Sequence, residues 1–139
     1  MQSSCHNLRV YYEDTDAGGV VYYANYLRYL ERARTEMLRK LGYEQKKLMH
    51  IDNIVFAVRS VTIDYLKPAH LDDQICIETI VQELQTRTVL FNQTVFLGNC
   101  KNKKKKLAEG LIKVVCLNSQ TFKMITIPKR IHRSLKNGN

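Results

Sequence analysis

The stretch that decides the fold is YYEDTDAGGVVYYANYLRYLERARTEMLRKL, residues 11–41. Its first half is rich in acidic residues and glycine, which is typical of a loop. From residue 24 onward, apolar residues recur at spacings of three and four, with charged residues between them. These apolar residues are Leu27, Leu30, Ala33, Met37, Leu38 and Leu41. The pattern predicts one long amphipathic helix over residues 24–41, with Asn25 as its N-cap and Gly42 as its C-terminal stop.

β-rich segments flank this helix on both sides. Residues 8–12 (LRVYY) form a short β-branched and aromatic run that predicts a strand before the loop. After a polar connection at 43–52, four more strands are predicted at 54–65, 74–84, 88–97 and 107–117, separated by turns at 67–73, 85–87 and 98–106. Apolar and polar residues alternate along 74–84, as expected for a sheet with one face on a core. We therefore expect an α+β protein in which an antiparallel sheet packs on one helix.

Length and composition place the chain among ordinary globular proteins. The 139 residues are 45% hydrophobic and 25% charged, and we find no repeat or linker, so a single domain over residues 1–139 is expected. The basic tail from Ile127 is expected to form a short helix after Pro128 or to fray. No apolar run approaches the roughly 20 residues that span a bilayer, and the N-terminus has no hydrophobic signal region. These features predict a cytoplasmic protein.

The cysteines and histidines show no metal-binding spacing. Cys5, Cys76, Cys100 and Cys116 include no C-x-x-C pair, and the four histidines stand far apart. We therefore expect reduced, structural cysteines and no metal site.

Positive charge is concentrated at the C-terminal end of the chain. The net charge is +9, yet residues 101–139 hold 11 Lys and Arg against the single acidic residue Glu109. Such an excess attracts a polyanion, which leaves three candidates: a nucleic acid, an anionic membrane or a phosphorylated small molecule.

The loop before the helix carries the residues suited to chemistry. Asp14 and Asp16 are followed by Gly18 and Gly19, which allow a tight turn or a close approach to a ligand. A helix N-terminus comes next, and its free N–H groups favour developing negative charge. A carboxylate base beside such donors is typical of a hydrolase. Taken alone, the same residues also suit a simple turn and helix cap.

A wider set of segments resembles a known family. Residues 11–26, YLERARTEML at 29–38, PAHLDDQICIET at 68–79 and AEGLIKVVCLNSQTFKMITIPKRI at 108–131 resemble the hotdog-fold acyl-CoA thioesterases of the 4-hydroxybenzoyl-CoA thioesterase type, in the YbgC-like or tol-pal-associated branch. This resemblance implies a hotdog fold, in which a five-stranded antiparallel sheet wraps around one long helix. It also implies a homo-oligomer that is a dimer of dimers, hence a homotetramer.

The resemblance also implies roles for single residues. Asp16 matches the family's catalytic Asp, acting as base or nucleophile, and the backbone N–H of Tyr23 matches the donor that polarises the thioester carbonyl. Near relatives usually have His where this chain has Tyr23, so the backbone role is the one that transfers. We assign Gly19 and Arg87 to substrate binding. The phosphates of coenzyme A are expected to meet Arg87, the lysines at 101–106 or the C-terminal tail.

The expected substrate is acyl-CoA or an acyl carrier protein thioester, with neither cofactor nor metal. The alternative is a non-catalytic hotdog scaffold whose basic C-terminal third docks on anionic lipid or nucleic acid. No RNP aromatic motif, KH loop or zinc pattern supports nucleic acid. Because a scaffold would be free to lose Asp16, its presence favours the enzyme.

Overall fold

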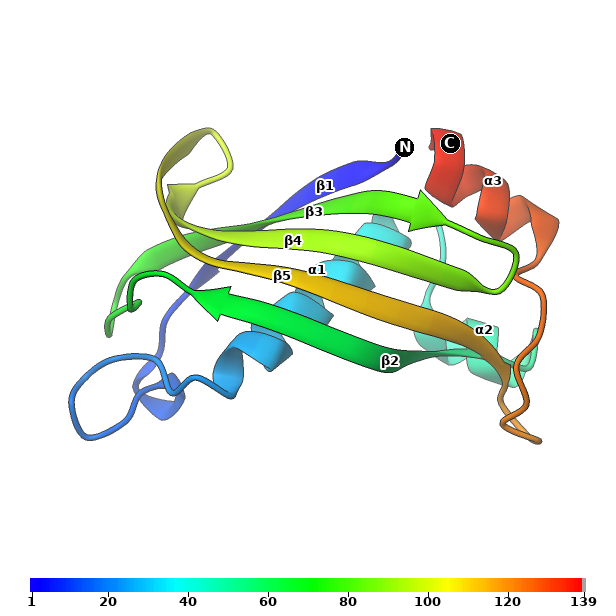
Figure 1. Cartoon of the computed structure of the whole chain (residues 1–139), viewed down its shortest axis with the longest axis horizontal. Coiled ribbons are helices and arrows are strands. Elements are labelled where there is room, and N and C mark those ends of the chain that lie inside the picture. Colours follow the sequence, from blue (N-terminus) through cyan, green and yellow to red (C-terminus); the bar gives the residue numbers. More distant parts are fainter. Residues whose placement is uncertain (139) are drawn as a thin grey trace.

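The computed structural model describes residues 1–138 and contains a five-stranded antiparallel sheet curved around one long helix (Figure 1). The strands are β1 (Ser3–Arg9), β2 (Ile54–Tyr65), β3 (Gln74–Leu84), β4 (Thr88–Asn99) and β5 (Asn102–Asn118), arranged in the order β1-β3-β4-β5-β2. Strands β2 and β3 have the bounds that the sequence predicts. The predicted sheet around one long helix is confirmed.

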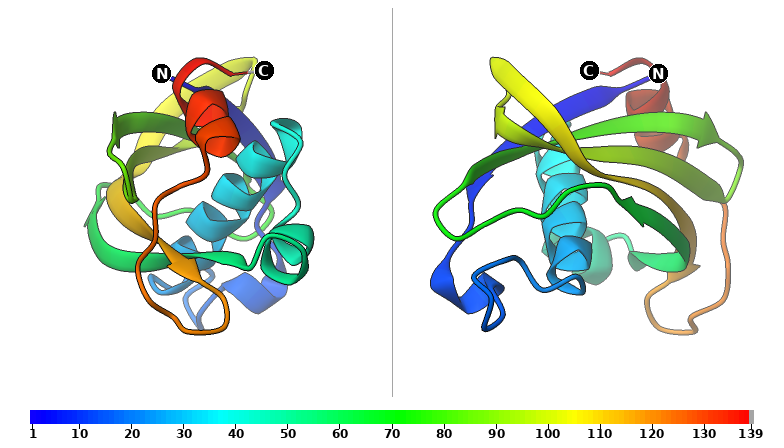
Figure 2. Two further views of the ribbon diagram at one scale, coloured as in Figure 1. Left: turned by 90° about the vertical axis from the view of Figure 1, so that its right-hand side faces the viewer. Right: turned by 60° about the vertical axis from the view of Figure 1, so that its left-hand side comes forward.

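Helix α1 (Asn25–Lys40) lies across the concave face of the sheet (Figure 2). The shorter helices α2 (Gln45–His50) and α3 (Lys129–Asn137) lie near the C-terminal end of α1, while the loop that precedes α1 lies at the opposite end of the molecule (Figure 1). The predicted helix after Pro128 is therefore confirmed as α3. This arrangement leaves the loop and the start of α1 accessible from one end of the sheet.

Strand alternation explains how the sheet holds α1. Residues of one parity on β3, such as Ile75 and Ile77, are fully buried in the core. Buried partners include Tyr29, Leu30, Ala33 and Met37 of α1, and Phe91, Val95, Ile112 and Val114 of β4 and β5. One polar side chain shares this layer: Gln93 donates to the Leu30 carbonyl oxygen at 3.0 Å and to Thr79 Oγ1 at 2.9 Å. A buried amide with its partners satisfied fixes α1 against the sheet.

The start of α1 differs from the prediction. Ala24, with φ −67° and ψ −21°, is already helical in backbone conformation and occupies the N-cap position, so Asn25 is the first helical residue. Because Asn25 lies inside the helix, its side chain is free to donate to the carbonyl oxygen of Asp14 at 2.8 Å. The predicted N-cap role of Asn25 is wrong, but the residue ties the loop to the helix. Gly42, with φ 97°, follows the helix end as predicted.

Other elements also differ from the sequence prediction. Strand β1 is Ser3–Arg9 rather than 8–12, because the chain leaves the sheet and makes a 3₁₀ turn at Tyr12–Asp14. The connection at 43–52 contains helix α2, whose six residues are too few for a clear periodic pattern. Lysines 103–106, predicted in a turn, belong to β5, since the β4–β5 hairpin turns tightly between Asn99 and Asn102.

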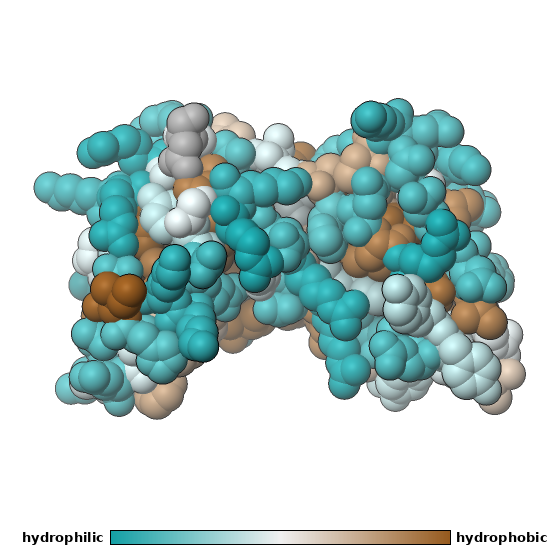
Figure 3. Space-filling view, turned by 180° about the vertical axis from the view of Figure 1, so that it is seen from behind, coloured by the Kyte–Doolittle hydropathy of each residue, from teal (hydrophilic) through white to brown (hydrophobic). Residues whose placement is uncertain are grey.

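Viewed from the side of α1, the surface of the molecule is mostly hydrophilic (Figure 3). Within residues 1–138, no helix combines the length and apolar character needed to cross a membrane.

Candidate active site

Asp14 fixes the loop that precedes α1. Its Oδ2 accepts a hydrogen bond from the Tyr11 N–H at 2.9 Å, which closes the 3₁₀ turn at Tyr12–Asp14. Its carbonyl oxygen accepts from the Tyr22 N–H at 3.0 Å and from Asn25 Nδ2 at 2.8 Å. Asp14 therefore has a positioning role, because both its side chain and its backbone hold the loop against the start of α1.

Asp16 lies on the exposed part of this loop. Its Oδ1 accepts a hydrogen bond from the Gly18 N–H at 2.8 Å, and no donor among residues 1–138 reaches Oδ2. A side chain at position 18 would place its Cβ 3.3 Å from Oδ1, so glycine permits this approach. The Gly19 N–H donates to the Asp16 carbonyl oxygen at 3.1 Å, and Gly19 has φ 78°, a conformation that suits glycine. The turn thus orients one carboxylate oxygen and leaves the other free.

The same loop is anchored to the connection between β2 and β3. The Val21 N–H donates to the Ala69 carbonyl oxygen at 2.9 Å, and the Leu71 N–H donates to the Gly19 carbonyl oxygen at 3.0 Å. The Ala69 N–H in turn donates to the phenol oxygen of Tyr26, on α1, at 3.2 Å. Loop, connection and helix therefore hold one another, which limits how far Asp16 can move relative to α1.

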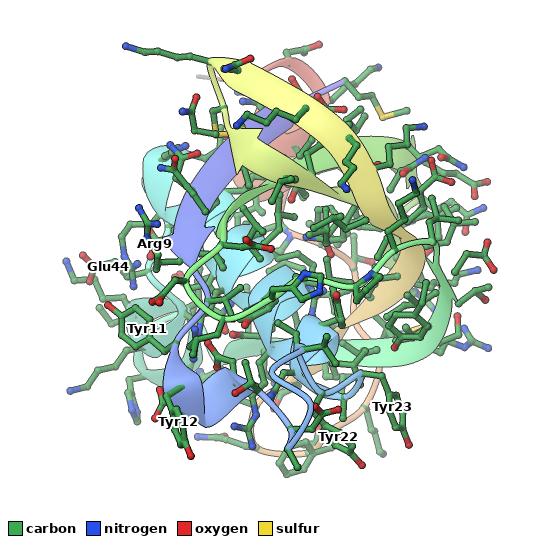
Figure 4. The ribbon with its side chains drawn as sticks, turned by 90° about the vertical axis from the view of Figure 1, so that its left-hand side faces the viewer. Arg9, Tyr11, Tyr12, Tyr22, Tyr23 and Glu44 are labelled. Atoms are coloured by element: carbon green, nitrogen blue, oxygen red, sulfur yellow. A yellow bond between two sulfur atoms is a disulfide. The ribbon has the colours of Figure 1, made fainter. Side chains whose placement is uncertain are left out.

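Tyr23 lies just before α1. Its side chain is 61% exposed, and its N–H has no acceptor among residues 1–138. The phenol of Tyr65, at the end of β2, donates to the Tyr23 carbonyl oxygen at 3.2 Å and so ties the backbone on the C-terminal side of this N–H to the sheet. Figure 4 views this end of the molecule and shows Tyr22 and Tyr23 at its rim, with Tyr11 and Tyr12 farther around. A free N–H at a helix start is suited to stabilise a developing oxyanion.

A cleft lined by aromatic rings lies beside Tyr23. Tyr23, Tyr26 and Tyr65 line it together with Val21, Leu66, Lys67 and Pro68. The ring centroids of Tyr26 and Tyr65 are 5.3 Å apart, and the rings pack edge to face. Burial raises the pKa of both Tyr26 and Tyr65 above the ordinary value of 10.0, so these phenols remain neutral donors at physiological pH. Sequence reasoning missed Tyr65 and Lys67, because only the folded sheet brings them to the loop.

Tyr29 is a second group that the sequence did not single out. Its side chain is buried, and its hydroxyl oxygen has no hydrogen-bond partner among residues 1–138. Burial, and then the neighbouring Asp14 carboxylate, raise the pKa of Tyr29 far above its ordinary value. The Tyr29 phenol therefore stays protonated at physiological pH, near the Asp14 carboxylate.

The structure brings three of the four predicted site residues together. Asp16, Gly19 and Tyr23 all belong to the loop and its junction with α1. Arg87 does not join them: it lies in the turn after β3, whereas Gly19 contacts the connection before β3, at the other end of that strand (Figure 1). Within one chain, Arg87 and Asp16 therefore lie at opposite ends of the sheet.

The lysine run lies in the β4–β5 hairpin and at the start of β5, at the same end of the sheet as the Asp16 loop (Figure 1). Lys103 pairs with Glu78 at 2.7 Å, and Lys106 pairs with Glu109 at 2.6 Å. In the part of the chain that the structure describes, Lys101, Lys104 and Lys105 form no ion pair. These three ammonium groups are the ones available to an anionic ligand.

The cysteines differ from the prediction. Cys5 and Cys100 form a disulfide, so the expectation that all four cysteines are reduced is wrong for this pair. The two residues are 95 positions apart in the sequence, and no spacing rule indicates that the β4–β5 hairpin reaches β1. Cys76 and Cys116 are free and buried, as expected.

A separate apolar cavity of about 100 Å³ lies between α1 and the sheet. Its walls include Leu38, Phe56, Val58, Val89, Phe91 and Val114, with Glu31 and Arg34 from α1. The Arg34 guanidinium donates to Gln93 Oε1 at 2.9 Å, and burial lowers its pKa. The lining residues do not include the loop at 11–23, so within one chain this cavity is distinct from the Asp16 site.

Comparison with known proteins agrees with this geometry. The family model described as the thioesterase superfamily matches residues 18–103. The chain is 42% identical to an acyl-CoA thioesterase YbgC of Haemophilus influenzae, covering 89% of this chain and 88% of the relative. It is 43% identical to an acyl-CoA thioester hydrolase YbgC of Escherichia coli O6:H1, covering 93% and 92%. A probable thioesterase from Bartonella henselae superposes with a TM-score of 0.84 at 29% identity, covering 91% of this chain and all of that one.

Proposed function

The chain belongs to the thioesterase superfamily and hydrolyses acyl-CoA thioesters, and we propose that Asp16 acts on the thioester carbonyl while the backbone N–H of Tyr23 polarises it. The observation that carries this proposal is the pairing of two unsatisfied groups on one rigid loop: the free Oδ2 of Asp16 and the free N–H of Tyr23. A thioester needs both a base or nucleophile and an oxyanion donor. The relatives also favour an enzyme over a non-catalytic scaffold.

Two routes are consistent with these groups. In the first, Asp16 removes a proton from water as the water attacks the carbonyl carbon, and the coenzyme A thiolate leaves and is protonated. In the second, Asp16 Oδ2 attacks directly, the C–S bond breaks, and water then hydrolyses the mixed anhydride to release the acid and regenerate Asp16. In both routes negative charge develops on the carbonyl oxygen, where an N–H donor stabilises it.

We propose that the chain forms a homodimer through the edge of β2, and that two dimers form a homotetramer. Within residues 1–138, β2 pairs only with β5, so its other edge is open. That strand exposes Val58, Val61 and Tyr65, and an open edge with apolar side chains favours pairing with another strand. In such an assembly Arg87 would approach coenzyme A from a neighbouring chain, since it lies far from Asp16 in its own.

Gly19 contributes to substrate binding in this proposal as the residue that brings backbone close to the thioester.

An acyl carrier protein is a second candidate carrier, because it presents the acyl group on the same thioester arm as coenzyme A. We propose a cytoplasmic location, because acyl-CoA is made and used inside cells.

The experiment that tests this function measures hydrolysis of a panel of acyl-CoAs of increasing chain length. The release of free coenzyme A thiol is the signal that is monitored. Matched acyl carrier protein thioesters form the second arm. We expect hydrolysis of at least one acyl-CoA without added metal or cofactor, with a preference among chain lengths. Absence of thiol release across both arms from a folded protein would contradict the proposal.

A further inference from the structure

Three cysteine sulfurs from distant parts of the chain meet on the sheet face that points away from α1. Cys5 comes from β1, Cys76 from β3 and Cys100 from the β4–β5 hairpin, and their Sγ atoms all lie within 4.8 Å of one another. Cys5 and Cys100 form the disulfide, and Cys76 is a free thiol beside it. We call these three residues the sulfur cluster. No step of thioester hydrolysis uses it.

Strand register places the cluster on the outer face of the sheet. Ile75 and Ile77 point into the core, so Cys76 between them points away from α1. In the pairing of β1 with β3, Cys76 lies opposite Asn7, so these two side chains share a face. Cys5 is two residues from Asn7 on β1 and therefore lies on that same face. Cys76 is nevertheless 0% exposed. The hairpin that carries Cys100 must therefore cover it.

Contacts other than the disulfide hold the hairpin in this position. The Cys100 N–H donates to Asn7 Oδ1 at 2.8 Å. Lys103, on the same hairpin, pairs with Glu78 of β3 at 2.7 Å. These contacts do not depend on the S–S bond. We therefore expect the three sulfurs to remain neighbours when the disulfide is reduced.

We propose that the reduced sulfur cluster binds one thiophilic metal ion of the Zn²⁺ type through the thiolates of Cys5, Cys76 and Cys100. A thiol reductant first converts the disulfide to two thiols and is itself oxidised to a disulfide, as expected in a reducing compartment. The metal ion then displaces three protons from the three thiols. Zinc–sulfur bonds of about 2.3 Å set sulfurs around one ion about 4 Å apart, a separation that the cluster accommodates.

The surroundings of the cluster fit this chemistry. The Lys103–Glu78 ion pair, at 2.7 Å, lies next to the cluster and keeps the local charge balanced before an ion binds. A bound metal ion deprotonates a coordinating thiol outright. Cys5 and Cys100 are partly exposed, which gives an ion access from the surface. Three sulfur ligands favour a soft ion such as Zn²⁺ over a hard one such as Mg²⁺.

The test uses full-length protein reduced with a phosphine, which is oxidised to its oxide as the disulfide opens, and then titrated without oxygen. Co²⁺ is the probe, because thiolate ligation gives a charge-transfer absorption band, and Zn²⁺ is then added as competitor. We expect one Co²⁺ per chain, its displacement by Zn²⁺, and no such band with the oxidised protein. An equal band from oxidised protein, or none from reduced protein, would overturn the proposal.

Two matched variants test which sulfurs bind. Cys76→Ser removes one sulfur of the cluster, and Cys116→Ser removes the other buried free thiol. We expect Cys76→Ser to weaken Co²⁺ binding by more than about 100-fold. Loss of a residue that only hydrogen-bonds to a metal ligand already weakens metal binding about 10- to 100-fold, and Cys76 is itself a proposed ligand. Cys116→Ser should bind as the parent does. Equal binding by Cys76→Ser would overturn the three-sulfur site, and retained acyl-CoA hydrolysis shows that each variant is folded.

Discussion

The phenol of Tyr65, the last residue of β2, donates a hydrogen bond of 3.2 Å to the carbonyl oxygen of Tyr23, two residues before α1. This contact joins the end of β2 to the backbone of Tyr23, whose N–H is the proposed oxyanion donor. The edge-to-face contact between the two rings, with centroids 6.2 Å apart, supports the same arrangement. Tyr65 is thus a positioning residue, because it acts through the backbone of Tyr23.

Tyr65→Phe should lower kcat with little change in KM. The ring packing is retained, but the lost hydrogen bond, worth about 0.5–1.5 kcal/mol, lets the Tyr23 peptide move when charge develops. We expect a two- to tenfold decrease in kcat, on the order of that energy. Tyr12→Phe is the control, since the Tyr12 hydroxyl makes no hydrogen bond among residues 1–138. A change in KM alone would mean that Tyr65 serves binding instead.

If the chain pairs through β2 as proposed, Val61→Lys should be a monomer. Val61 is on the open edge strand β2, and a charge placed on an edge opposes pairing with a second edge. Leu111→Lys is the matched control, because Leu111 is similarly exposed but lies on β5, inside the sheet. Light scattering should show an even-order oligomer for the parent and for Leu111→Lys. A monomeric and active parent would exclude assembly through β2.

Replacing Lys104 and Lys105 together by Gln should raise KM for acyl-CoA and flatten its dependence on salt. Neither lysine forms an ion pair in the described part of the chain, so both can attract the coenzyme A phosphates over a Debye length of about 8 Å. The matched double variant, Lys129→Gln with Lys136→Gln, removes the same charge from α3. Because neither pair touches Asp16, kcat should change little. An increase in KM only for the α3 variant would indicate that the coenzyme A phosphates bind near α3 and not near the β4–β5 hairpin.

His6 should make the protein less stable at acidic pH. Burial lowers its pKa below 6.5, with Lys40 and Arg32 acting in the same direction and Glu36 opposing them. As pH falls through 6.5, the unfolded chain gains the proton first, so the free energy of unfolding decreases until the lower folded pKa is passed. Urea unfolding of the parent should show this loss, and His6→Gln should reduce it. Identical pH profiles would contradict the assignment to His6.

Local patterns in the sequence predict much of the fold. The three- and four-residue spacing between Leu27 and Leu41 identifies α1, and alternation identifies β3, because both signals depend on neighbouring residues alone. A run of lysines is typical of a loop, so the sequence does not predict the strand at 103–106, where Lys103 and Lys106 pair with Glu78 and Glu109. The family resemblance to YbgC-like acyl-CoA thioesterases is confirmed by the relatives.

The candidate site also contains both residues that are close in sequence and residues that only the fold brings together. Asp16, Gly19 and Tyr23 are close in sequence, so their proximity is predictable. Tyr65 reaches Tyr23 only because β2 ends beside the start of α1, and the sulfur cluster forms only because β3 lies between β1 and β4. Such contacts depend on strand order, which the spacing of residues does not encode.

The most direct test of the account is the turnover of acyl-CoA by Asp16→Asn, with Asp14→Asn as its control. The asparagine retains the acceptor for the Gly18 N–H but removes the base or nucleophile, so kcat should fall by at least about 100- to 10,000-fold while circular dichroism stays unchanged. Asp14→Asn keeps an acceptor for the Tyr11 N–H and should cost much less. Unchanged turnover in folded Asp16→Asn would contradict the central claim.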